Sequence, residues 1–211
     1  MEMSTRIAAA AVLGVAMLPA GVAWGHDGHH GPLAVAATPQ GAAVKLSDTV
    51  LTDQDGRHLR LLSDVVADKV VVVSFVFTNC TDTCPVVSHT FSQLQDQLGS
   101  ALDSRVRLVS LTVDPARDTP SVLKAYSAHH GAQPGWLWLT GSSANVTEAL
   151  KGFGAYSANF ENHPGVVLIG DGRSGKWTRF YDIENAQRLI AKTQEFLAAK
   201  GQDKVVSAGK E

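Results

Sequence analysis

The feature that most constrains this chain is the apolar run between Lys69 and Phe77, which only Ser74 interrupts. Its valines and phenylalanine occupy consecutive positions instead of alternating with polar residues. That pattern is typical of a strand buried on both faces, and such strands occur mostly in parallel sheets covered by helices. The run therefore predicts a central parallel strand in a layered α/β fold.

Strand and helix patterns alternate along the rest of the chain. An Asp-Gly turn at 53–56 predicts a hairpin between 49–51 and 58–61. Further strands are expected at 105–113, 136–139, 166–169 and 176–181, and helices at 85–98, 120–129, 144–153 and 184–200. This order predicts an α/β fold with a central sheet flanked by helices and an N-terminal β-hairpin.

The composition narrows the class of protein. The chain has 211 residues, of which 45% are hydrophobic and 18% charged, as expected for a globular chain with one core. Eighteen basic and twenty acidic residues give a formal charge of −2, so no basic field attracts a phosphate backbone. Nucleic acid is therefore not an expected partner.

The N-terminal 25 residues have the pattern of a secretory signal, with a short start that carries Arg6, an uncharged apolar stretch and small residues near Ala23. They predict an exported protein, either periplasmic after cleavage or membrane-anchored facing the periplasm if the segment is retained. Residues 26–43 are expected to be a linker. It carries His26, His29 and His30, which suit a divalent metal or belong to a polar leader. The main domain is expected at 44–200, before a flexible tail at 201–211.

Cys80 and Cys84 lie between the buried strand and the expected helix, where open α/β sheets commonly bind ligands. Residues four apart share one face of a helical turn, so both sulfurs can converge on one small centre. The positive end of a helix also favours thiolates, which bind metals and attack disulfides. An inert disulfide is the alternative, but so short a loop would stabilise the fold little. The pair therefore predicts metal binding or redox chemistry.

Two thiolates under-ligate most metals, and an added imidazole gives a ligand set that suits Cu(I). Of the eight histidines, His163 precedes an expected strand at a sheet end that can be the cysteine edge. His89 lies on the same expected helix as Cys84 but points to another face. His129 and His130 lie at the C-terminus of the expected helix 120–129, where a favourable interaction with the helix dipole accounts for them. We therefore favour Cys80, Cys84 and His163 as the metal ligands.

Three segments together carry a resemblance to a known family. They are the Cys-x-x-x-Cys-Pro segment at 77–85, the Asp-Pro-x-Arg-Asp-Thr-Pro segment at 112–120, and His163 before an apolar strand. This combination resembles the SCO/SenC family of thioredoxin-like copper proteins, over residues 44–200. The resemblance implies a thioredoxin-like domain in which the two cysteines and the later histidine hold copper.

The resemblance also implies a function. It indicates a metallochaperone more than an enzyme. Such a protein holds Cu(I) and delivers it to a cuproprotein acceptor, such as the copper-bearing subunit of cytochrome c oxidase. The alternative is a thiol–disulfide oxidoreductase, in which Cys80 and Cys84 are the catalytic redox pair. Both roles need a thiol reductant as a partner in an oxidising compartment. Peroxide reduction by a thiolate has little support in the sequence.

Two departures from the family pattern bear on the site. Thr81 stands where many members have proline, a change that loosens the loop without removing a ligand. The Pro164-Gly165 pair after His163 is similar to the cis-proline loop of thiol oxidoreductases. Asp114 and Asp118 are expected to shape the loop beside the site. They are turn or helix-cap residues or have a direct functional role.

Overall fold

The computed structural model describes residues 39–81, 83–181 and 185–208, with side chains up to residue 200. The signal or anchor expected at 1–25 and most of the linker expected at 26–43 lie outside these residues. Within the described ranges, no helix combines the length and apolar character needed to cross a membrane.

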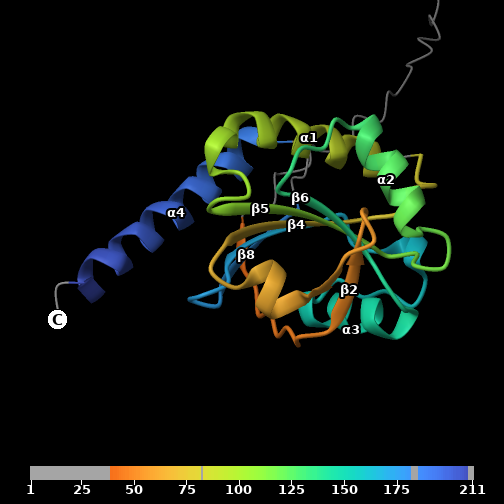
Figure 1. Cartoon of the computed structure of the whole chain (residues 1–211), viewed down its shortest axis with the longest axis horizontal. Coiled ribbons are helices and arrows are strands. Elements are labelled where there is room, and N and C mark those ends of the chain that lie inside the picture. Colours follow the sequence, from red (N-terminus) through yellow and green to blue (C-terminus); the bar gives the residue numbers. More distant parts are fainter. Residues whose placement is uncertain (1–38, 82, 182–184, 209–211) are drawn as a thin grey trace, which may run out of the picture. The chain divides into compact units, whose positions relative to one another are not determined.

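Strands of the described chain form one mixed sheet (Figure 1). They are β1 (Gln40–Gly41), β2 (Val50–Asp53), β3 (His58–Arg60), β4 (Val70–Val76), β5 (Val106–Thr112), β6 (Trp136–Thr140), β7 (Val167–Asp171) and β8 (Lys176–Phe180). Their spatial order is β1-β8-β7-β4-β5-β6-β2-β3. The central position expected for β4 is confirmed: it pairs in parallel with β5 and antiparallel with β7. The N-terminal hairpin is also confirmed, as β2 and β3.

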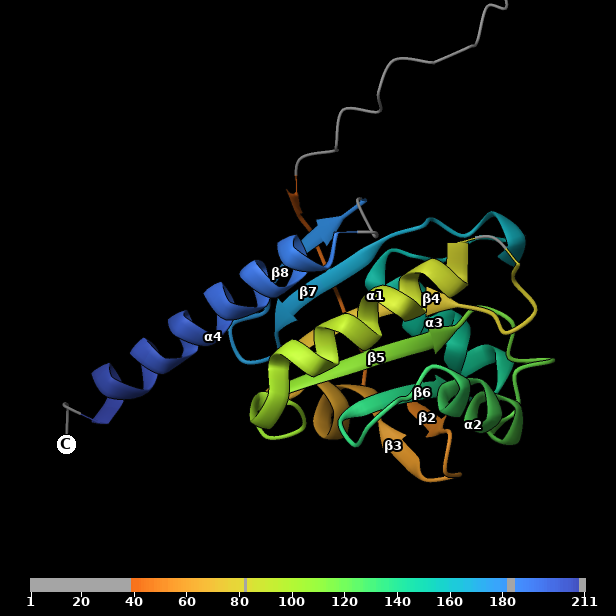
Figure 2. The same ribbon diagram turned by 90° about the horizontal axis from the view of Figure 1, so that it is seen from above.

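Helices cover both faces of this sheet. They are α1 (Thr83–Leu98), α2 (Pro120–His129), α3 (Ser143–Phe153) and α4 (Ala186–Ala208), with the shorter turns η1 (Leu61–Val66), η2 (Gly99–Ala101) and η3 (Phe160–Asn162). Figure 1 shows α1 and α2 above the strands and α3 below them, and in Figure 2 α4 lies beside α1. The expected α/β architecture with a flanked central sheet is therefore confirmed.

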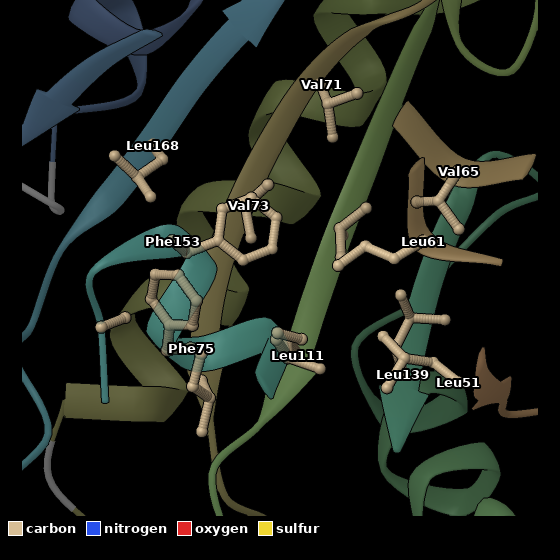
Figure 3. Packing of buried hydrophobic residues seen from close by; sticks show 14 of the residues in the cluster. Leu51, Leu61, Val65, Val71, Val73, Phe75, Leu111, Leu139, Phe153 and Leu168 are labelled. Carbon is tan, nitrogen blue, oxygen red and sulfur yellow. The ribbon is translucent and has the colours of Figure 1, made fainter. Parts of the chain in front are cut away.

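The uninterrupted run of β4 follows from this layering. Val71, Val73 and Phe75 face the cluster that includes α3 and η1 (Figure 3), whereas Val70 and Val72 face the cluster that includes α1. All residues of β4 are buried. Because neither face of the strand meets water, the sequence has no polar alternation there.

Described elements extend past both ends of the range 44–200 expected for the domain. Strand β1 lies within the expected linker and pairs with β8, so the folded chain begins before Val44. A strand of two residues carries no sequence period, which explains why the pattern missed it. Helix α4 continues to Ala208, into the expected flexible tail. It passes through Gly201, since a glycine inside a helix costs only about 1 kcal/mol relative to alanine.

The sheet register brings three loops to one edge. Val76, the last residue of β4, pairs with Thr112, the last residue of β5. Strand β7 runs the other way and begins beside the same end of β4, where Val167 pairs with Ser74. The loops after β4, after β5 and before β7 therefore lie together. We call this edge the cysteine edge, because Cys80 follows β4.

Candidate metal centre

The two thiols lie at the cysteine edge in different surroundings. Cys80 is half-buried on the loop after β4, and its N–H donates to the Phe77 carbonyl at 3.1 Å. Cys84 lies in the first turn of α1 with 1% of its surface exposed. The Cys84 N–H donates to the Cys80 sulfur at 3.5 Å. The loop therefore brings one backbone donor of the α1 start onto the Cys80 sulfur.

The expected thiolate character is wrong for Cys84. Burial among apolar side chains, together with a hydrogen bond to Cys80, raises the pKa of the Cys84 thiol to about 12. The charged form loses its hydration there, and this cost exceeds the opposing effect of a backbone hydrogen bond at Phe77. Cys84 is therefore a protonated thiol at neutral pH when no metal is bound.

His163 lies on the loop before β7, directly after η3. Its N–H donates to the Phe160 carbonyl at 3.1 Å, and its ring lies edge-on to Phe77 with centroids 6.0 Å apart. The ring Nδ1 donates to the Pro164 carbonyl at 3.3 Å, which leaves Nε2 as the lone-pair nitrogen. Burial lowers the pKa of the imidazole. The neutral ring that a metal requires is therefore favoured.

Cys80 and His163 line the same cavity, of about 310 Å³, at the cysteine edge. Phe160, Arg117 and Glu161 complete much of its wall. Cys84 is not among the residues that line it. Among the described side chains, no three His, Cys, Asp or Glu residues stand close enough together to hold a metal ion. The expected ligands are thus neighbours at one edge, but the three do not form a closed site.

Asp118 shapes the loop beside the site, as expected. Its buried carboxylate accepts hydrogen bonds from the Thr78 hydroxyl at 2.5 Å and the Thr112 hydroxyl at 2.6 Å. It also accepts the Thr78 N–H at 3.3 Å. Asp118 therefore ties the loop that carries Cys80 to the end of β5. Helix α2 is capped by Thr119 and not by Asp118.

The remaining histidines of the described chain lie away from this cavity. His89 is exposed on α1 and contacts Gln93, and His58 contacts Thr52 on the hairpin. His130 packs on Tyr126 at the end of α2. His26, His29 and His30 lie outside the described residues. His163 therefore lines the cavity of Cys80, and His89 does not.

One expectation about the histidine loop is wrong. The similarity to a cis-proline loop suggested a cis bond before Pro164, but the peptide bonds of the described chain are all trans.

Two residues of the site were missed by the sequence reasoning. Arg117 belongs to a motif that was recognised without a role for it, and Phe160 stands in a segment with no motif or period.

The fold and the site together define a class of protein. It is an α/β protein with a thioredoxin-like sheet, two thiols after a central strand and a histidine before the neighbouring strand. The sequence model of the SCO1/SenC family matches residues 37–198. The chain belongs to the SCO1/SenC family.

Two relatives illustrate the range of similarity. A SCO1 protein homolog of Bacillus subtilis is 35% identical over 118 residues, which are 54% of this chain and 60% of the relative. A SCO2-like protein of Rickettsia felis is 32% identical over 160 residues, which are 71% of this chain and 74% of the relative. The chain thus matches less than two thirds of the Bacillus relative.

Solved structures show the same fold. A SCO1/SenC family lipoprotein from Bacillus anthracis is 27% identical with a TM-score of 0.62, covering 75% of this chain and 98% of that one. BsSco, a member of the Sco family of cytochrome c oxidase assembly proteins, is 28% identical with a TM-score of 0.61, covering 74% and 95%. The copper-bound ScoI of Bradyrhizobium japonicum is 22% identical with a TM-score of 0.61, covering 72% and 99%, and supports the fold alone.

Proposed function

We propose that this chain holds Cu(I) as cargo through Cys80, Cys84 and His163 and delivers it to a cuproprotein. The observation that carries the proposal is the shared cavity of Cys80 and His163, beside which the Cys84 N–H contacts the Cys80 sulfur. Thiolate and imidazole are soft and borderline ligands that suit Cu(I). Membership of the SCO1/SenC family supports the same cargo, because the resemblance to that family implies that these residues hold copper.

Binding of Cu(I) requires changes in the protonation and the position of the protein's own side chains. Cys84 must release the proton that burial holds with a pKa of about 12, and its sulfur must approach the cavity that Cys80 lines. His163 needs no proton loss, because its burial favours the neutral ring and its Nε2 carries the lone pair. The proton of Cys84 makes the affinity for Cu(I) rise with pH.

The position of the cavity at the cysteine edge suits transfer of Cu(I) to another protein. A ligand of an acceptor protein can enter there and replace one of the chain's own ligands at a time. The acceptor we propose is the copper centre of cytochrome c oxidase, since BsSco belongs to a family of assembly proteins for that enzyme. We place the chain outside the cytoplasm, where a thiol reductant keeps the pair reduced. Mass spectrometry of the protein from its own cells tests whether residues 1–25 are removed.

The experiment is an anaerobic titration of the reduced full chain with Cu(I) in the presence of a competing chromophoric chelator. We expect one tightly bound Cu(I) per chain, and transfer to an acceptor domain that carries a Cys/His copper site. A chain oxidised to the Cys80–Cys84 disulfide is the control, because a disulfide offers no thiolate. An unchanged affinity after oxidation contradicts the thiolate site.

A second function, thiol–disulfide exchange, is favoured by the unequal burial of the two thiols. Cys80 lines the cavity and Cys84 lies behind it, an arrangement suited to an attacking and a resolving thiol. The Cys80 thiolate would attack a partner disulfide and release one partner thiolate. Cys84 would then attack Cys80 and release the second, so that two electrons pass to the partner. Reduction of an acceptor's oxidised cysteines without copper tests this function.

A further inference from the structure

We propose that loop 114–118, here called the clamp, positions both halves of the site. Asp118 fixes the loop that carries Cys80 (residues 77–81, the thiol loop), and Arg117, through Phe160, positions His163. This inference rests on the proposed function, because it assigns positioning residues to the same site. In this role Arg117 and Phe160 do not bind Cu(I) themselves. They restrict where the His163 ring can lie.

Arg117 is oriented by a buried acid and points its guanidinium at an aromatic ring. Its Nη1 donates to the Asp114 carboxylate at 2.7 Å, and the Asp114 side chain is only 8% exposed. The guanidinium carbon lies 5.4 Å from the centroid of the Phe160 ring. Such a cation–π contact is attractive, and the ion pair limits the orientations of the arginine. Arg117 thus joins the loop after β5 to η3, which precedes His163.

Phe160 supports His163 in two ways, one direct and one through Phe77. Its carbonyl accepts the His163 N–H at 3.1 Å, so the backbone of the histidine is held by the same turn. Its ring packs edge-on against Phe77, with centroids 5.3 Å apart. Phe77 in turn packs edge-on against the His163 ring at 6.0 Å. Phe160 therefore supports both the backbone of His163 and the ring against which its imidazole lies.

The position of Phe160 between two cavities makes this support necessary. Phe160 and His163 line the site cavity and also a neighbouring cavity of about 230 Å³. Removing the phenyl ring would open space between the two cavities and give the imidazole additional orientations. Each added orientation in the metal-free protein must be lost on binding, which lowers the affinity.

The other side of the clamp begins one residue further along the chain. Asp118 accepts hydrogen bonds from Thr78 on the thiol loop, as described above. Arg117 and Asp118 thus connect one short loop to both halves of the site. Because that loop follows directly on the buried β5, it sets the separation between the segments that carry Cys80 and His163.

A double-mutant cycle tests the clamp. Phe160→Ala is made in the parent full chain and in the His163→Ala background, and Cu(I) affinity is measured by chelator competition. We expect Phe160→Ala to weaken binding about tenfold in the parent, as outer-sphere changes commonly do. In the His163→Ala background we expect a change of less than about twofold, because the affected ligand is absent. Equal losses in both backgrounds would overturn the proposal, as would no loss in either.

Further variants separate positioning from general damage. Phe160→Tyr keeps the ring and should retain parental affinity. Arg117→Ala should weaken binding about threefold to tenfold, whereas Arg173→Ala, which removes an exposed arginine paired with Asp68, should change nothing. If Phe160→Ala fails to fold, the same cycle with Arg117→Ala and His163→Ala replaces it. Matching losses for Arg117→Ala and Arg173→Ala would overturn the proposal.

A measurement without copper distinguishes failure of this inference from failure of the proposed function. NMR signals of the His163 imidazole in the reduced, metal-free protein should shift and broaden in Phe160→Ala and Arg117→Ala, and stay unchanged in Arg173→Ala. If the parent binds no Cu(I), the proposed function is wrong, yet these signals still report whether the clamp positions the ring. Unchanged imidazole signals in both clamp variants would overturn the clamp even if the parent binds copper.

Discussion

The two halves of the site are held by different kinds of interaction. The thiol loop follows β4 directly, enters α1 after a few residues, and is tied to the buried Asp118 carboxylate by hydrogen bonds from Thr78. The histidine loop runs from the end of α3 to β7. Its Phe160 and His163 rings pack edge-on against Phe77 at the end of β4. Hydrogen bonds to a buried carboxylate demand a fixed geometry, whereas aromatic contacts tolerate small shifts. We therefore expect changes on the thiol side to remove binding and changes on the histidine side to weaken it.

The largest effect should come from the thiols. Cys80→Ser and Cys84→Ser each replace a soft sulfur ligand with a hydroxyl that binds Cu(I) poorly. We expect both variants to lose tight Cu(I) binding in chelator competition while keeping the parental circular dichroism spectrum. Tight binding retained by Cys84→Ser would mean that the buried thiol is not a ligand and that the thiol side tolerates changes as the histidine side does.

The next effect separates the two thiols from each other. With a pKa of about 12, Cys84 is a thiolate in only about one molecule in ten thousand at pH 8. Cys80, which lines the cavity, should react with iodoacetamide at least about a hundredfold faster. Mass spectrometry of the alkylated protein measures the two rates. Equal rates would contradict the difference in burial.

The same pKa shift makes a signed prediction for stability. The pKa of the Cys84 thiol in the fold is raised above its ordinary value of 9.0, to about 12. A raised pKa means that stability is fully present below about pH 9 and is lost as pH rises toward 12. The unfolding free energy of the reduced protein should therefore fall more steeply over this range than that of Cys84→Ser. A parallel fall in both proteins would contradict the assignment.

Asp118 should have an effect on the fold as well as on the site. Asp118→Ala leaves the half-buried Thr78 hydroxyl and the buried Thr112 hydroxyl without their acceptor, which should lower the unfolding free energy by about 3 kcal/mol. Urea unfolding with an unchanged denaturant slope measures the loss. Asp55→Ala is the control, because its ion pairs with Arg57 and Lys124 are exposed and should contribute less than about 1 kcal/mol.

The histidine side should give a smaller effect. His163→Ala should weaken Cu(I) binding by about ten- to a hundredfold and leave two thiolates in place. His89→Ala is the matched control, since His89 is exposed on α1 and contacts Gln93. Loss of binding in His89→Ala with parental binding in His163→Ala would show that the ligand assignment is wrong.

The sequence predicted the parts of this molecule that carry a strong local pattern. The run of β4 and the Asp-Gly turn of the β2–β3 hairpin both placed their elements correctly. Burial and long-range packing could not be read in the same way. The raised pKa of Cys84 depends on apolar residues from several elements, and Phe160 meets Arg117 and Phe77 only after the sheet forms. Such contacts leave no period in the sequence.

The smallest effect is expected from the N-terminal segment, and it tests whether the two described halves are sufficient. A chain that begins at Val35 keeps β1, whose pairing with β8 is extended by the Ala42 N–H donating to the Trp177 carbonyl at 2.9 Å. We expect its Cu(I) affinity to lie within about twofold of the parent, because Cys80, Cys84 and His163 are all retained. A chain that begins at Val44 lacks β1 and should be less stable, so it is unsuitable for this test. If the Val35 chain lost the tight Cu(I) site, the imidazoles of His26, His29 and His30 would have to be counted among the ligands. Loss of only a weaker Cu(II) site would instead assign those histidines a separate role.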